Sequence, residues 1–412
     1  MLKKTVDRLL RHRHFWRDVG FDELSELYIS TFFRGLSISI TGLFVPIYLF
    51  RLGFPLTYIF LVFASYFSIR LFTDFAAAYT VARIGPKHTM LIGNFLQIIA
   101  LAMFLSLTKF HWPLWLVGMI WGSSASYYFI PFHVDFSKVK HAKHGGKELG
   151  YVNIMDKIGG GVGPLLGGIV AALFGAQYIF LVAIALLIMS TIVLFRTPEP
   201  VRVRQKLNFR ALPINKLKRD FQSVGALGIE NTLCVILWPL YIAMFIVSSE
   251  SIYIKVGLLA SLSVVIAVIT AWAIGKLIDD RRGRSLLRYS ATTNGLLHLA
   301  RPFAATFPVA AGISLLNEVV TVGYRMPYWK GAYDAADDLP GLRIVYLSSM
   351  EAFASVCKAA AWWLLLILAW ALPSGYVVVV CGFALASLAS FMIMKERFKA
   401  LDSPQEYNKS HE

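Results

Sequence analysis

Twelve apolar stretches, each close to the about 20 residues that a helix needs to cross a bilayer, follow one another along the chain. They cover residues 26–50, 56–82, 88–108, 112–134, 151–174, 176–195, 224–248, 252–275, 285–305, 307–325, 344–370 and 374–394. Polar residues dilute the pattern most in the ninth and tenth stretches. The pattern predicts an all-α membrane protein with twelve transmembrane helices.

The longest polar stretch, residues 196–222, separates the sixth apolar stretch from the seventh and carries eight basic residues. It divides the chain into two halves of six helices. We predict an amphipathic cytoplasmic helix over 1–20, a six-helix bundle over 21–196, a basic cytoplasmic linker over 197–222, a second six-helix bundle over 223–396 and a cytoplasmic tail over 397–412.

Composition and charge agree with this topology. Of 412 residues, 57% are hydrophobic and 16% charged, where soluble domains have about 25% charged residues. With both termini placed in the cytoplasm, 32 of the 40 Lys and Arg residues fall in inner segments and four, including Arg51 and Arg301, in outer loops. This imbalance predicts a multi-pass protein of the plasma (inner) membrane with both termini cytoplasmic. The net charge of +16 is spread over seven inner segments without a stacking motif, so nucleic-acid binding is not expected.

Enzymatic and metal chemistry find little support in the sequence. Cys234, Cys357 and Cys381 each lie inside an apolar stretch, and we interpret them as small buried residues. A loosely metal-like group exists, but lysines surround it and would repel a divalent cation; its members are His133, Asp135, His141 and His144. No nucleophile elbow or phosphate-binding loop is recognisable. We therefore predict no enzyme activity, no cofactor and no metal, with a membrane enzyme or non-transporting receptor as remote alternatives.

Residues 150–168 carry the most specific pattern. Gly159, Gly163 and Gly167 recur every four residues, so one helix face has no side chains and a neighbouring helix can approach it closely, while Pro164 bends the helix. The stretch resembles the fifth-helix antiporter motif of the major facilitator superfamily in all of its fixed positions. These positions are Gly150, Gly159, Gly163, Pro164, Gly167 and Gly168.

Two polar turns resemble a second motif of that superfamily, the cytoplasmic loop motif G-x-L-x-D-R-x-G-R-K. One follows the second apolar stretch and one the eighth, and their glycines, Gly85 and Gly283, are 198 residues apart. The first copy has Ala82 in place of the aspartate, and Asp74 is our candidate replacement. The resemblance implies a cytoplasmic gate made by Asp74, Arg83, Gly85, Asp135, Asp156, Gly275, Asp279, Arg282, Gly283 and Arg284.

The resemblance implies two pseudo-symmetric six-helix bundles, the fold of this superfamily, that rock about a central substrate site. We expect a monomeric secondary transporter of the drug and metabolite antiporter branch. It would export a small amphipathic or charged organic solute, driven by protons, with uptake of a metabolite by symport or uniport as the alternative. One departure concerns residues 116–122, where a glycine takes the place of the arginine that drug–proton antiporters carry.

Ionisable residues inside the predicted spans are the candidate site residues, because burying a charge in a bilayer is costly. They are Arg34, Glu230, Glu318, Glu351 and Lys358. A carboxylic acid away from water can exchange a proton near neutral pH, so Glu230 or Glu351 is the predicted protonation site. Arg34 is predicted to bind an anionic group of the substrate or to balance those glutamates, and Arg70 and Asp74 are predicted to form an ion pair.

The resemblance places the first, fourth, seventh and tenth helices around the central cavity. Aromatic residues of the fourth and seventh helices are therefore candidates for stacking on an amphipathic substrate. They are Tyr127, Tyr128, Trp238 and Tyr241.

Overall fold

Twelve long helices make up the computed structural model, which describes residues 21–139, 145–194, 207–247, 251–279, 283–337, 339, 342–398 and 401. The first half contains α2 (Phe21–Arg51), α3 (Leu56–Ile84), α4 (Pro86–Leu105), α6 (Leu114–Val139), α7 (Gly145–Phe174) and α8 (Tyr178–Leu194), with the single turn α5 (Leu107–Phe110) between α4 and α6. The second half contains α9 (Ile214–Tyr241), α10 (Ile252–Asp279), α11 (Gly283–Ala300), α12 (Phe307–Asp337), α13 (Arg343–Ala371) and α14 (Gly375–Ile393). The predicted all-helical fold is confirmed.

Each predicted apolar stretch corresponds to one long helix, and two helices extend far beyond one end of their stretches. Helix α9 begins at Ile214, inside the polar stretch, and α12 continues to Asp337. Within the described residues, eight helices are long and apolar enough to cross a membrane, and α11 is not among them because polar and basic residues interrupt its sequence. Hydrophobicity therefore locates the helices well and their polar ends less well.

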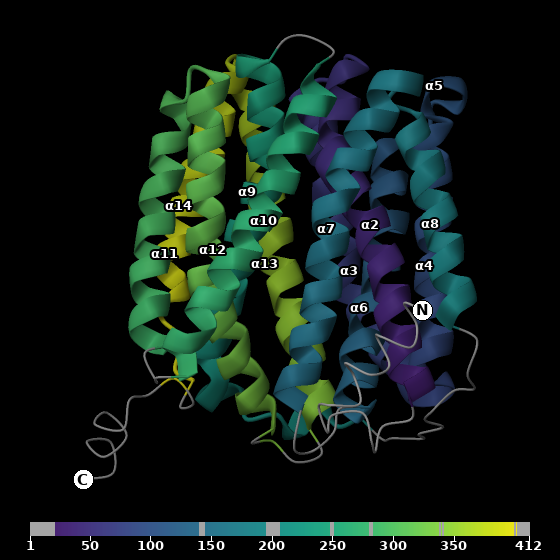
Figure 1. Cartoon of the computed structure of the whole chain (residues 1–412), viewed down its shortest axis with the longest axis vertical. Helices are drawn as coiled ribbons and strands as arrows, with labels where there is room; N and C mark the ends of the chain where they lie inside the picture. Colours follow the sequence, from purple (N-terminus) through teal and green to yellow (C-terminus); the bar gives the residue numbers. More distant parts are fainter. Residues whose placement is uncertain are drawn as a thin grey trace, which may run out of the picture.

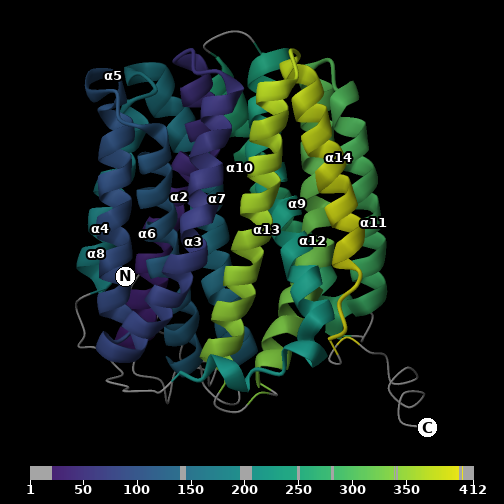
Figure 2. The same cartoon turned by 180° about the vertical axis from the view of Figure 1, so that it is seen from behind.

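The two halves lie side by side, with α2 to α8 in one group and α9 to α14 in the other (Figures 1 and 2). They meet mainly along two helix pairs, α3 with α13 and α7 with α10, and also where α2 contacts α9. Aromatic rings also pack across this boundary: the centroids of Phe60 on α3 and Trp362 on α13 are 5.4 Å apart, and those of Phe44 on α2 and Tyr253 on α10 are 5.6 Å apart.

One apolar core is shared by both halves, and it lies at the end of the bundle where the predicted outer loops are. It contains the second part of α2 and the first part of α3 together with the end of α9 and the first part of α10. At the opposite end, the described residues form separate clusters, one on α9, α11, α12 and α13 and smaller ones on α3, α4, α6 and α8. Among the described residues, the apolar core that the halves share thus lies at one end, whereas at the opposite end Leu207 and Phe209, which precede α9, pack against clusters of both halves.

The chain after α14 folds back beneath the second half. Arg284, at the start of α11, donates to the carbonyl oxygen of Phe398 over 2.9 Å and lies 3.3 Å from the Glu396 carboxylate. The amide of Arg397 donates to Asp220 of α9 over 3.2 Å. Phe398 is buried against the ring of Tyr328. Three helices are therefore linked through this short segment.

Candidate functional site

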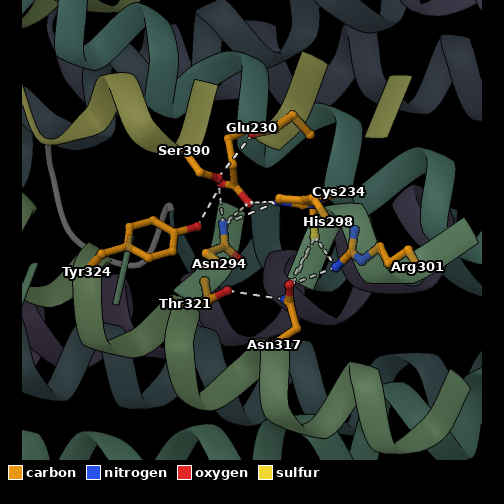
Figure 3. A network of polar contacts seen from close by, with 10 residues as sticks. Glu230, Cys234, Asn294, His298, Arg301, Asn317, Thr321, Tyr324 and Ser390 are labelled. Carbon is orange, nitrogen blue, oxygen red and sulfur yellow. Dashed lines mark hydrogen bonds and ion pairs between the residues drawn. The ribbon is translucent and has the colours of Figure 1, made fainter. Parts of the chain in front are cut away.

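A buried polar network surrounds Glu230 in the second half (Figure 3). One carboxylate oxygen accepts from Asn294 over 2.9 Å and lies 3.1 Å from Nε2 of His298, and the other accepts from the Tyr324 hydroxyl over 2.6 Å. Asn294 also donates to Ser390 over 3.0 Å. We call these five residues the Glu230 network. Both oxygens of this carboxylate, which is 1% exposed, have partners.

Regular spacing on two helices brings several of these polar residues together. Glu230 and Cys234 are one turn apart on α9, Asn294 and His298 are one turn apart on α11, and each pair therefore shares a helix face. Tyr324 stands on α12 and Ser390 on α14. The network joins four helices of the same half.

Arg301 extends the polar region toward the end of α11. It is fully buried, and its Nη2 donates to Asn317 over 2.7 Å and contacts the Cys234 sulfur at 3.1 Å. Its guanidinium lies 5.0 Å from the ring of Trp238. The prediction that Arg301 lies in an outer loop missed this contact, and Cys234 contacts polar groups although it was interpreted as a purely apolar residue.

A second network surrounds Arg34 in the first half. The Arg34 guanidinium donates to the side-chain oxygen of Asn94 and lies 3.6 Å from the ring centroid of Tyr128. Asn94 donates to Thr191 over 2.9 Å, and the hydroxyls of Ser190 and Ser30 are 2.9 Å apart. We call Arg34, Asn94, Tyr128 and Thr191, together with the adjacent Ser190, the Arg34 network; the bonds of Ser190 go to Ser30 of α2 rather than to the other four residues.

The two networks occupy corresponding helices of the two halves. Their asparagines lie on the third helix of each half and their serines on the sixth, and each pair is 200 residues apart: Asn94 with Asn294, and Ser190 with Ser390. Their tyrosines, Tyr128 and Tyr324, lie on the fourth helix of each half, 196 residues apart. Arg34 and Glu230 lie on the first helix of each half and are also 196 residues apart. The internal repeat therefore keeps the neutral groups, whereas the charge at this position changes sign.

A third polar group connects the halves. Arg70 of α3 lies 3.6 Å from Asp74 on its own helix and 3.3 Å from Glu351 of α13, while Ser355 donates to Asp74 over 3.1 Å. We call these four residues the interface bridge. The Arg70–Asp74 contact that was predicted is present, with Glu351 as an additional partner. Lys358, two turns after Glu351, lies 5.5 Å from the ring of Phe67.

A sequence model of the Major Facilitator Superfamily matches residues 27–329, which is most of the chain. The chain belongs to the major facilitator superfamily. Membership in this superfamily indicates a transporter rather than an enzyme. No curated protein has significant sequence similarity to the chain.

Solved structures of superfamily transporters share its fold. The peptide transporter POT in complex with sulfate has a TM-score of 0.72 at 9% identity, covering 93% of this chain and 94% of its own. The D-xylose-proton symporter has a TM-score of 0.69 at 12% identity, covering 90% and 97%. The nucleoside transporter NupG has a TM-score of 0.67 at 14% identity, covering 90% and 98%.

The superfamily's helix-five motif uses two faces of α7. A Cβ atom built on Gly163 would lie 2.9 Å from the Leu36 carbonyl of α2, and one on Gly167 would lie 2.6 Å from the Phe44 ring. Gly159 faces α2 in the same way. Pro164 and Gly168 face α10 in the other half, where a Cβ on Gly257 would lie 2.5 Å from the Pro164 carbonyl. The regular glycine face therefore packs within its own half.

The loop motifs are only partly described. Gly85 ends α3 with a φ of 92°, a conformation that favours glycine, and Arg83 beside it is exposed. Gly283 and Arg284 begin α11, where Arg284 holds the segment after α14. The remaining predicted motif and gate residues lie outside the part of the chain whose side chains the structure describes. They are Asp135, Gly150, Asp156, Gly275, Asp279 and Arg282.

The predicted aromatic residues lie mainly inside the bundles. Tyr128 contacts Arg34, and Trp238 and Tyr241 stack on each other with centroids 5.6 Å apart while Trp238 donates to Ser314. Tyr127 is half-buried. Glu318, also half-buried, stands next to Asn317 on α12. A polar residue every three or four positions along α11, namely Asn294, His298 and Arg301, was the available signal for the Glu230 network.

Proposed function

We propose that this protein is a secondary transporter that moves a small amphipathic or charged organic solute by alternating access, with proton-coupled export as the favoured mode. The observation that supports this best is the apolar core that the halves share at one end of the molecule, whereas the described residues at the other end form several smaller clusters. Two bundles that are joined at one end can exchange that contact for one at the other end by rocking.

The interface bridge supports the same motion. An ion pair and a hydroxyl contact across two packed helices can separate more readily than interlocked apolar side chains, provided that water or solute replaces the lost partners. Glu351 and Lys358 on α13 are thus our candidates for groups whose contacts change as the halves move. We further propose a monomer in the plasma membrane with both termini in the cytoplasm, as the distribution of Lys and Arg suggests.

Protonation of Glu230 or Glu351 is the proposed coupling step. Glu230 is held by three donors in one half, so taking up a proton would rearrange the Glu230 network. Glu351 contacts Arg70 across the interface, so taking up a proton would weaken the interface bridge. A proton at either position can therefore change how the helices pack.

Uptake by symport or uniport is the second candidate, and one contact favours it. Gly122 of α6 packs against α3 so closely that a Cβ atom would lie 2.1 Å from the Tyr66 carbonyl, and Gly118 makes a similar contact with Val62. An arginine at either glycine would require α6 and α3 to separate. The arrangement familiar from drug–proton antiporters is thus sterically disfavoured at these positions.

Transport can be tested without knowing the solute in advance. A thermal-shift screen of metabolites and drugs on the purified protein at two pH values identifies a ligand, and counterflow of that ligand in proteoliposomes then tests transport. Glu230→Gln and Glu351→Gln should each abolish or uncouple flux that is driven by a pH gradient. Unchanged coupling in both variants would remove these glutamates from the mechanism, and absence of counterflow would contradict a transporter.

The glycine packing gives a matched control for the rocking motion. Gly163→Leu should slow exchange strongly while the protein still inserts into the membrane, because the side chain would collide with α2. Gly160→Ala should leave exchange unchanged, since a Cβ atom there meets nothing within 4 Å. Equal rates in the two variants would show that close packing of α7 on α2 does not limit transport.

A further inference from the structure

The first half holds a buried cation whose bonding capacity is only partly used. Arg34 is 1% exposed, and its Nε and Nη2 have no acceptor among the described residues. Its Nη1 bonds to a neutral amide, and its guanidinium is covered by a tyrosine ring. No described carboxylate contacts it. A buried charge without a counter-ion is strongly unfavourable, so this site favours an anion.

Further unpartnered groups on the surrounding helix faces are also able to donate. Thr31 precedes Arg34 by three residues on α2 and therefore shares its face, and the Thr31 hydroxyl has no partner in the described part of the chain. Gln97 follows Asn94 by three residues on α4, and its side-chain nitrogen likewise lacks a described acceptor. Both side chains are buried. Among the described residues, the helix faces that carry Arg34 and Asn94 thus have several buried donors without acceptors.

The second half differs in the charge at the centre of its network. There the position that corresponds to Arg34 is Glu230, and both oxygens of this carboxylate have partners. Arg301 in that half is also buried with two nitrogens that lack a described partner, but the Glu230 carboxylate belongs to the same polar region. Among its described residues, the Arg34 network has a cation and no anion.

We infer that the Arg34 network is a binding site for a small inorganic anion such as chloride, held by Arg34 between α2, α4 and α6. The enclosed position favours a small ion over a large organic one, because Tyr128 covers the guanidinium at 3.6 Å and both residues are buried. Guanidinium groups bind anions through charge-assisted hydrogen bonds. This site does not depend on the proposed transport function.

Halide binding can be measured on the purified full-length protein in detergent. Thermal unfolding is followed while sodium chloride or sodium bromide replaces sodium gluconate at constant ionic strength. We expect a saturable rise in the midpoint with both halides. Arg34→Gln should raise the apparent dissociation constant at least about tenfold, as expected for the loss of a hydrogen bond from a charged group.

Arg301→Gln is the matched control, because it also removes a buried guanidinium with unpartnered nitrogens but should keep the halide effect. No difference between halide and gluconate, or an unchanged halide effect in Arg34→Gln, would overturn the inference. Should only organic anions from the ligand screen stabilise the protein through Arg34, the site belongs to the transported solute and the inorganic assignment is wrong.

A second measurement holds even where Arg34→Gln fails to fold. Crystals of the wild-type protein grown in bromide should give an anomalous scattering peak within hydrogen-bonding distance of the Arg34 side chain. Absence of that peak at bromide concentrations that saturate the thermal shift would contradict the proposed site.

Discussion

The Glu230 and Arg34 networks use the same neutral residues on corresponding helices, yet they differ in how completely the central charge is bonded. Glu230 has a donor at each oxygen, whereas Arg34 has two buried nitrogens without a described acceptor. A buried charge with all its bonds made contributes rigidity, and one with bonds left unmade is available for a ligand. The comparison shows that an internal repeat can keep its polar scaffold while its two copies take different roles.

Removing the carboxylate should have the largest effect on stability. Glu230→Ala leaves Asn294, His298 and Tyr324 buried without their acceptor, and we expect a loss of about 3–5 kcal/mol. Thermal unfolding in detergent measures this loss. Glu230→Gln, which keeps the shape and one acceptor oxygen, should lose less. A loss below about 1 kcal/mol for Glu230→Ala would contradict a fully bonded network.

Removing one donor should have an intermediate effect. Tyr324→Phe deletes the hydroxyl that bonds to the Glu230 carboxylate over 2.6 Å, and hydrogen bonds to charged groups contribute about 1.5–3 kcal/mol. The same unfolding assay applies, and a double-mutant cycle with Glu230→Gln isolates the coupling between the two groups. Strictly additive effects would indicate that this bond contributes little.

The serines test whether the shared scaffold behaves alike in both halves. Ser190→Ala and Ser390→Ala each remove one buried neutral hydroxyl, so both should cost about 0.5–1.5 kcal/mol. Similar values would support equivalent structural roles for corresponding positions. A large difference between the two variants would show that the central charge determines the contribution of its neighbours.

Arg34→Met should have the smallest effect, and its sign is the most informative. Replacing a buried charge that lacks a counter-ion by an apolar side chain of similar length should be nearly neutral or stabilising, within about 1 kcal/mol, in gluconate buffer. Unfolding in gluconate and in chloride gives the comparison. A loss as large as that of Glu230→Ala in gluconate would mean that the Arg34 network is as completely bonded as its counterpart.

The fold was largely accessible from the sequence because bilayer-crossing length and loop charge are local signals. Glu230 was identified as a candidate because acidic residues are rare in membrane helices. Its partners were missed because Asn294 and His298 lie on the ninth stretch, which is not one of the four that the resemblance places around the central cavity. Neutral polar residues such as Asn94 carry no charge signal, and only the packing of α4 against α2 and α6 brings them beside Arg34.

At the interface between the halves, the sequence predicts the Arg70–Asp74 contact but not the partner from the other half. Arg70 and Asp74 are one turn apart, so their contact follows from helix geometry. The addition of Glu351 depends on the register between α3 and α13, which are more than 250 positions apart in the chain. No local pattern contains that register. The same limit applies to Gly168 and Gly257, whose helices come from different halves.

The segment after α14 sets a boundary for anyone who shortens or tags this protein. A chain ending at Ile393 would lack Glu396 and Phe398, two of the partners that hold the buried guanidinium of Arg284 at the base of α11. The same truncation would remove the Phe398 ring, which packs against the ring of Tyr328. A fluorescent or affinity fusion therefore belongs beyond Leu401, where the last described side chain is already in place.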